Sequence, residues 1–150
     1  MIASKFFTPD QKQQIVGAIK NAELDTSGEI RVHIENHCKK EVLDRASAVF
    51  ASLKMHKTKL RNGVLFYLAI KDQKFAILGD GGINAVIPDD FWDKIKEMMQ
   101  QKFKEGEFTV GLSSGITMAG EQLKDHFPYQ SDDINELDDD ISFGDDKSDD

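Results

Sequence analysis

The sequence predicts a single layered α/β domain with a mixed sheet, four main helices and at least three strands. Four stretches carry apolar residues at helical spacing. Residues 29–35 alternate apolar and polar side chains, as a strand does, and residues 64–70 are apolar throughout, as in a strand covered on both faces. Helices and strands in this order pack as layers around one core, and 150 residues are enough to bury such a core.

The first helix is predicted from Pro9 to about Leu24. Thr8 stands at the N-cap, Pro9 at the first helical position, and Gln11 where a capping box has its reciprocal acceptor. One face of this helix is apolar and is expected to pack into the core; it consists of Ile15, Ala18, Ile19 and Ala22.

A turn at residues 25–28 leads into a strand over residues 29–35. The apolar side chains of this strand are expected to point into the core, and the polar ones outward; the polar set is Glu29, Arg31, His33 and Glu35. Opposite charges two residues apart on one strand face can pair in water. We therefore interpret Glu29, Arg31 and Glu35 as a solvated ladder.

A second helix over residues 41–54 connects this strand to the central strand at residues 64–70. A strand–helix–strand unit makes its two strands parallel. The polar residues 71–74 then turn the chain into a short strand at residues 75–78, which forms an antiparallel hairpin with the central strand. The predicted sheet is therefore mixed.

Two more helices and a tail complete the chain. The helices are predicted over residues 88–104 and 108–123, with Gly106 between them. We place the folded domain at residues 1–128. Residues 129–150 are acidic and poor in apolar side chains, which cannot repay the entropy of ordering, so a disordered acidic tail is predicted there.

The charge distribution argues against nucleic-acid binding. The net charge is −8, but residues 131–150 hold nine Asp, one Glu and one Lys and so contribute −9, which leaves +1 for residues 1–130. A near-neutral body has no broad basic face, and an acidic tail repels phosphates. No signal segment and no run of about 20 apolar residues is present. We therefore expect no membrane insertion and a soluble, cytoplasmic monomer.

The chemistry of the chain is concentrated between Phe75 and Asp93, where an apolar strand meets a glycine turn and an acidic helix start. The turn matches no phosphate-binding glycine loop, and the Asp inside it would repel a phosphate. Carboxylate, amide and carbonyl oxygens are instead the ligands of hard cations. We therefore predict a Ca²⁺ or Mg²⁺ site, with the candidate ligands Asp80, Gly81, Gly82, Asn84, Asp89 and Asp90.

Two of these candidates have another role open to them. Asp89 and Asp90 stand at a predicted helix start, where carboxylates cap backbone amides and complement the helix dipole. Capping and metal binding both remain open for this pair. Asp80 has no such competing role in the sequence, so it ranks first among the candidate ligands.

Five sequence elements, in this order, resemble the TPM domain family, and in particular its short soluble bacterial branch. The elements are Phe7-Thr8-Pro9, Ser27-Gly28-Glu29-Ile30-Arg31-Val32, Asn62-Gly63-Val64-Leu65, Ile77-Leu78-Gly79-Asp80-Gly81-Gly82-Ile83-Asn84, and Phe103-x-Glu105-Gly106-x-Phe108-x-x-Gly111-Leu112. The resemblance covers residues 5–128. It implies a three-layer α/β/α sandwich with a Rossmann-like appearance, divalent-cation binding at acidic loops, and a phosphatase label.

The resemblance also matches Asp89 to the family's Asp at the helix start, whereas Asp80 is typical of the short branch. Relatives include a thylakoid lumen protein implicated in photosystem II repair. This chain lacks that protein's export signal, so the cellular role is not transferred.

Three functions are compatible with these residues. The leading one is a domain that binds Ca²⁺ or Mg²⁺ through Asp80, Asp89 and their neighbours. The second is a metal-dependent phosphatase, in which a metal at Asp80 acts with Arg61 and Lys59 on a phosphate ester, with no catalytic residue assigned. The third is an interaction module, in which the acidic tail docks the domain on a protein partner.

Overall fold

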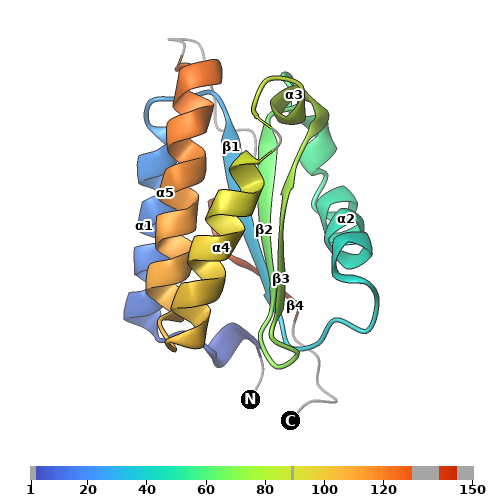
Figure 1. Ribbon diagram of the computed structural model, residues 1–150, viewed down its shortest axis with the longest axis vertical. Coiled ribbons are helices and arrows are strands. Elements are labelled where there is room, and N and C mark those ends of the chain that lie inside the picture. The colour runs from blue at the N-terminus through green and yellow to red at the C-terminus, as the bar shows by residue number, and fades with distance from the viewer. Residues whose placement is uncertain (1–2, 89, 130–138, 145–150) are drawn as a thin grey trace.

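The computed structural model describes residues 3–88, 90–129 and 139–144. A four-stranded sheet lies between two layers of helices (Figure 1). Helices α1 (Pro9–Glu23), α4 (Phe91–Lys104) and α5 (Phe108–His126) cover one face, and α2 (Val42–Ser52) covers the other. This arrangement confirms the predicted α/β/α sandwich and its four main helices.

Shorter elements fill the connections. Two 3-10 turns, η1 (Ala3–Lys5) and η2 (Met55–Lys57), precede α1 and β2 (Gly63–Ala69), and a short helix, α3 (Gly81–Asn84), follows β3 (Lys74–Gly79). Within the described part of the chain, no helix combines the length and apolar character that crossing a membrane requires.

The strands lie in the order β3, β2, β1, β4, where β4 is Ser142–Gly144. β1 (Glu29–Glu35) and β2 (Gly63–Ala69) are parallel, with His33 opposite Tyr67, and α2 connects them. β3 (Lys74–Gly79) is antiparallel to β2. The predicted strand–helix–strand unit, the hairpin and the mixed sheet are confirmed.

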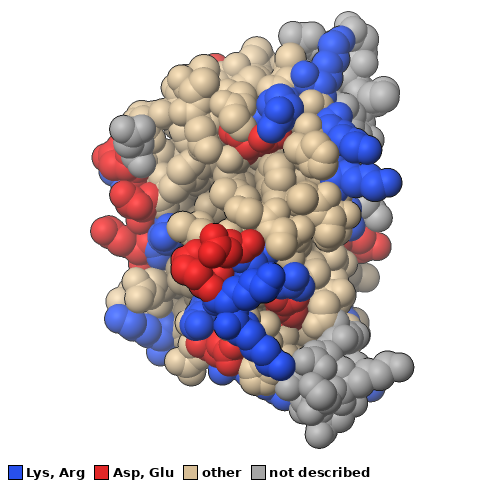
Figure 2. Space-filling model, turned by 90° about the vertical axis from the view of Figure 1, so that its right-hand side faces the viewer, with Lys and Arg blue, Asp and Glu red and all other residues tan. Residues whose placement is uncertain are grey.

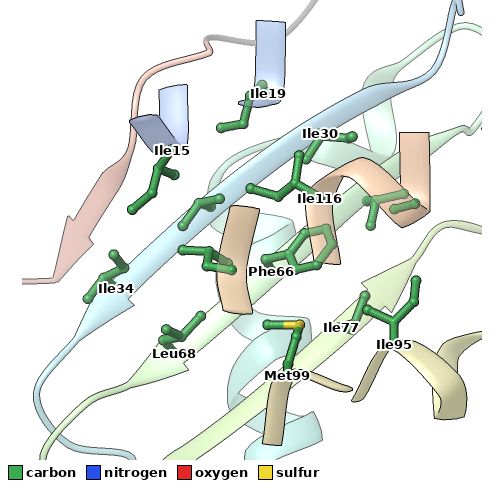
Figure 3. Packing of buried hydrophobic residues seen from close by; sticks show 14 of the residues in the cluster. Ile15, Ile19, Ile30, Ile34, Phe66, Leu68, Ile77, Ile95, Met99 and Ile116 are labelled. Atoms are coloured by element: carbon green, nitrogen blue, oxygen red, sulfur yellow. The ribbon is translucent and has the colours of Figure 1, made fainter. Parts of the chain in front are cut away.

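The main core lies between the sheet and the three-helix layer (Figure 3). Every residue of β2 is buried, which accounts for the unbroken apolar run in its sequence. Each large apolar side chain buried here contributes about 1.5–3 kcal/mol. The labelled members of this core are Ile15, Ile19, Ile30, Ile34, Phe66, Leu68, Ile77, Ile95, Met99 and Ile116. A smaller cluster, which includes Leu65 and Tyr67, lies under α2.

The start of α1 follows its local sequence. The Thr8 hydroxyl accepts a hydrogen bond from the Gln11 amide at 3.1 Å, and the Gln11 side chain accepts one from the Thr8 amide at 2.9 Å. The predicted capping box is therefore present.

The interpretation of the polar face of β1 as a solvated ladder was wrong. Glu29, His33 and Glu35 are only 3%, 7% and 6% exposed, and Arg31 is half-buried. The physical reason is that side chains from other elements lie against this face: Arg45 of α2 bonds to Glu35, and Ser142 near the C-terminus lies 2.8 Å from His33. Alternation in the sequence separated the two faces of the strand correctly, but it does not report what packs on each face.

The acidic tail also differs from its prediction over one stretch. Ser142–Gly144 form a short strand, β4, parallel to β1. Ile141 and Phe143 pack against the main core, and this apolar contact accompanies the short strand. Residues 130–138 and 145–150 lie outside the described residues, so disorder there, and the domain boundary at residue 128, stay predictions.

Candidate functional site

Asp80 follows β3 directly and is 6% exposed. Arg61, from the loop before β2, donates from Nε to Oδ2 and from Nη2 to Oδ1 of Asp80, both at 2.7 Å. The Gly81 amide donates to Oδ1 at 2.8 Å. Asp80 is thus the N-cap of α3, a role that we did not assign to it from the sequence.

These contacts keep the Asp80 side chain ionised at neutral pH. Burial opposes ionisation, but the hydrogen bonds from Arg61 and from the Gly81 amide outweigh it and hold the pKa of the Asp80 carboxyl below its ordinary value. The side chain is therefore a carboxylate at neutral pH and is available only as an acceptor of hydrogen bonds or as a ligand of cations.

The glycine turn fits tightly against the loop that carries Arg61. The Gly82 amide donates to the Arg61 carbonyl at 2.9 Å. A Cβ atom on Gly82 would lie 2.2 Å from the Leu60 carbonyl oxygen and 2.7 Å from that of Arg61. Arg61 itself has a positive φ of 53°, which few residues other than glycine adopt. Gly82 is therefore required by the close approach of two backbone segments.

Asn84 closes the other side of the turn. Its side-chain nitrogen donates to the Gly79 carbonyl at 2.8 Å, and its oxygen accepts a hydrogen bond from the Trp92 indole at 3.1 Å. Gly79 leaves room for this indole, since a Cβ there would lie 2.8 Å from the Trp92 ring. Asn84 thus ties α3 to β3 and α4.

The acidic helix start does not join this network through Asp90. Asp90 is exposed, makes no capping hydrogen bond with its side chain, and lies 3.7 Å from Lys94. The helix begins at Phe91, later than the predicted Pro88. Asp89 lies outside the described residues, so its role stays a prediction.

The structure thus brings four of the six predicted ligands into one turn, namely Asp80, Gly81, Gly82 and Asn84. Their side-chain oxygens are directed to protein donors: those of Asp80 to Arg61 and Gly81, and that of Asn84 to Trp92. Among the residues that the structure describes, no group of three His, Cys, Asp or Glu side chains is arranged to hold a metal ion. A cation would have to displace protein partners from this turn.

A second polar cluster, at the far end of β1, was missed in the sequence. Arg45 of α2 donates from Nε and Nη2 to the two oxygens of Glu35, each at 2.8 Å. The Tyr67 hydroxyl donates to Glu35, and His33 lies 3.2 Å from the same carboxylate. The signal was available in the alternation of ionisable residues on a strand whose crossover helix must cover one face.

This environment shifts two ionisation equilibria. Burial would raise the pKa of Glu35, but the hydrogen bonds from Arg45, His33 and Tyr67 together lower it to about 2. Burial and the neighbouring Glu35 carboxylate raise the pKa of the Tyr67 hydroxyl. At neutral pH the Glu35–Arg45–Tyr67 cluster is therefore an ion pair with a neutral tyrosine hydrogen-bonded to its carboxylate.

On the α2 side of the molecule, acidic and basic side chains lie close together beside an uncharged central area (Figure 2). An apolar pocket of about 410 Å³ lies elsewhere, between the hairpin and the layer of α4 and α5. Its lining includes Phe75, Phe103 and Phe108, with Lys74 and Lys104 among the polar residues. Because Lys74 begins β3 and Asp80 follows its end, this pocket and the glycine turn lie at opposite ends of that strand.

Comparison with known proteins places the chain in a family. The family model of the TPM domain matches residues 2–122. No curated protein is significantly similar to the chain. Among solved structures, the BA42 protein of the psychrophilic bacterium Bizionia argentinensis is 51% identical, with a TM-score of 0.88, and the match covers 93% of this chain and 97% of that one.

Two more distant structures share the fold. An N-terminal domain from P. gingivalis is 19% identical with a TM-score of 0.68, and the match covers 85% of this chain and 84% of that one. The N-terminal domain of the cg2496 protein of Corynebacterium glutamicum is 12% identical with a TM-score of 0.63, and the match covers 79% of this chain and 74% of that one. The family model and the 51% identity to BA42 show that the chain belongs to the TPM domain family.

Proposed function

We propose that the chain is a divalent-cation-binding TPM domain and that Ca²⁺ or Mg²⁺ binds at Asp80 in exchange for the guanidinium of Arg61. The observation that carries the proposal is the asymmetry of this ion pair, in which the Asp80 side chain is 6% exposed and that of Arg61 is 56% exposed. The carboxylate is anchored at the end of β3, whereas its counter-ion reaches it from the surface. Arg61 therefore occupies a position that another cation can take.

The chemistry of the turn favours a hard cation. Asp80 is ionised at neutral pH, so no proton has to leave before a metal binds. A divalent ion carries twice the charge of a guanidinium and lies about 2.3–2.6 Å from carboxylate oxygens in Ca²⁺ sites. The other proposed ligands are the carbonyls of Gly81 and Gly82, Asn84, Asp89 and Asp90. Asn84 and Asp90 would have to exchange their present partners, Trp92 and Lys94.

Amide NMR spectra recorded during titration with CaCl₂ or MgCl₂ test the proposal. Saturable shifts are expected over residues 79–93 and should disappear in Asp80→Asn. The Arg61→Ala variant should bind the cation several-fold more tightly, because the competing guanidinium is removed. The matched control is Asp72→Asn, which removes a carboxylate that pairs with His37 at the other end of β3.

Two outcomes would contradict cation binding at this turn. One is a titration without saturable shifts over residues 79–93. The other is a response in Asp80→Asn that equals that of the unaltered chain, since the ion would then bind elsewhere. Weaker binding in Arg61→Ala would contradict the exchange itself, because it would make Arg61 a support of the site and not a competitor.

A metal-dependent phosphatase is the second candidate, and the contact of Arg61 with Asp80 is the observation that favours it. If a metal replaced Arg61 on Asp80, the guanidinium would become available to a phosphate oxygen beside the metal. Hydrolysis of a generic phosphate ester would then require both residues. Hydrolysis that continues at the original rate in Asp80→Ala would point to a contaminating enzyme.

A further inference from the structure

The outer edge of β1 is occupied by a segment of the chain's own tail. Ser142, Phe143 and Gly144 lie opposite His33, Ile34 and Glu35 in a parallel ladder. β4 is three residues long and, among the described residues, is the last strand on this side of the sheet. An extended peptide added in this way to a sheet edge gains affinity from main-chain hydrogen bonds and specificity from its alternate side chains.

One face of the segment lies against the polar side chains His33 and Glu35 of β1. The Ser142 hydroxyl lies 2.8 Å from Nδ1 of His33, whose other ring nitrogen is 3.2 Å from Glu35. At Gly144 a Cβ atom would lie 2.6 Å from Oε1 of Glu35 and 3.1 Å from Nε2 of His33. This face therefore fits a hydroxyl residue and then, two positions later, a glycine.

The other face of the segment packs against the main core. Ile141 and Phe143 pack against it, and the Lys12 ammonium of α1 lies 5.2 Å from the centre of the Phe143 ring. Such a cation–π contact contributes about 0.5–1 kcal/mol at an exposed site. The edge of β1 thus accommodates an apolar residue, a hydroxyl residue, an aromatic residue and a glycine, in that order.

The occupant also has an unfavourable contact. Asp139 forms a side-chain hydrogen bond with Glu23. The Glu23 carboxyl also accepts a hydrogen bond from the Ile30 amide at 2.9 Å. Two carboxyl groups share a hydrogen bond only when one of them carries a proton, and burial together with Asp139 raises the pKa of Glu23 to about 9. A ligand with a neutral side chain at the position of Asp139 would avoid this requirement.

We propose that the edge of β1 is a peptide-binding groove, that residues 139–144 occupy it from within the chain, and that a partner protein displaces them with an extended apolar–Ser/Thr–aromatic–Gly segment. The resident segment is suited to displacement because its described part pairs with β1 through three residues and because Asp139 faces Glu23. This groove is distinct from the turn at Asp80, so the proposal stands or falls independently of cation binding.

The test uses the full-length ¹⁵N-labelled chain and an acetylated, amidated synthetic peptide of residues 139–144. Saturable shifts are expected at His33, Ile34 and Glu35 as the signals of the resident Ser142–Gly144 move to new positions. A tethered segment competes at an effective concentration on the order of mM. The Gly144→Val chain, whose own segment no longer fits, should therefore bind the peptide at least tenfold more tightly, and Phe143→Ala provides a second way to release the segment.

Control peptides make the result specific. A peptide with Val in place of the glycine should not bind, and one with Asn in place of Asp139 should bind more tightly at pH 8. Absence of shifts at residues 33–35 in both Gly144→Val and Phe143→Ala would overturn the proposal, as would equal binding of the Val peptide. A concentration-dependent dimer that the peptide dissociates would assign the groove to a second copy of this chain and overturn the assignment to a partner.

Discussion

Arg45 and Glu35 form a two-point ion pair, with both hydrogen bonds at 2.8 Å, that joins the crossover helix α2 to the end of β1. Arg61 and Asp80 form a pair of the same geometry near the opposite end of the sheet, where the Asp80 amide donates to the Gly63 carbonyl at the start of β2. In each pair the carboxylate is buried and the arginine is more exposed. Both pairs attach a connecting segment to the sheet by charge-assisted hydrogen bonds.

The Glu35 pair predicts a defined acid sensitivity. The pKa of Glu35 is about 2 in the folded chain and 4.5 ordinarily, so its contribution to stability is fully present above pH 4.5 and is lost as the pH falls toward 2. Glu35→Gln should lower the free energy of unfolding at pH 7 by about 1–3 kcal/mol. Urea unfolding followed by circular dichroism measures this change.

The comparison with pH 2.5 makes the Glu35 prediction specific. The gap between Glu35→Gln and the unaltered chain should shrink there, because Glu35 is then almost fully protonated in the unfolded chain and most of the stability gained from its ionised folded form is lost. Glu97→Gln on α4, an exposed position, is the control and should leave the midpoint unchanged. A gap that is the same at both values of pH would show that the loss of Glu35 acts through packing and not through charge.

The raised pKa of Glu23 predicts that stability falls, and does not rise, with increasing pH. Its pKa is raised from 4.5 to about 9, by burial first and then by Asp139, so the folded chain holds a proton that the unfolded chain releases. Stability should therefore fall as the pH rises from about 4.5 to 9. Glu23→Gln should flatten this dependence and stabilise the chain at pH 8, measured as the thermal midpoint between pH 5 and 9. An unchanged slope in the variant would assign the trend to other groups.

The two glycines after Asp80 predict unequal effects of the same substitution. Gly82→Ala would place Cβ 2.2 Å from the Leu60 carbonyl oxygen, and a forced shift of this kind costs about 1–3 kcal/mol. Gly81→Ala meets nothing within 4 Å and should be neutral, or stabilising by about 0.4–1 kcal/mol through the unfolded state. Chemical denaturation of the two variants provides the measurement. Equal stabilities would show that the loop at residues 60–61 yields without cost.

The elements of the fold were accessible from local signals. The capping box of Thr8 and Gln11, the apolar run of β2 and the turn before β3 each depend on residues close together in the chain. The strand–helix–strand rule then determined which strands are parallel. The short strand β4 was not accessible in this way, because Phe143 gains its stability only from the core that other elements provide.

The candidate site was accessible in part. A glycine turn with an embedded carboxylate could be located at Asp80, but the partner that neutralises this carboxylate is Arg61, 19 positions earlier in the chain. The absence of an evident capping role for Asp80 was misleading, since it caps α3, a helix of four residues that is too short for a periodic signal. Hydrogen-bond partners of this kind follow from chain geometry and not from spacing.

The sequence by itself determined the order and type of the four main helices and of β1, β2 and β3, the two faces of β1 and the place of the glycine turn, because each rests on the conformational preferences and periodicity of neighbouring residues. Only the tertiary structure decided which polar side chains are buried and what they meet. Glu35 pairs with Arg45 from 10 positions away, Asp80 with Arg61 from 19, and His33 with Ser142 from 109. Burial makes each of these contacts strong, and burial is created by the packing of the layers on the sheet.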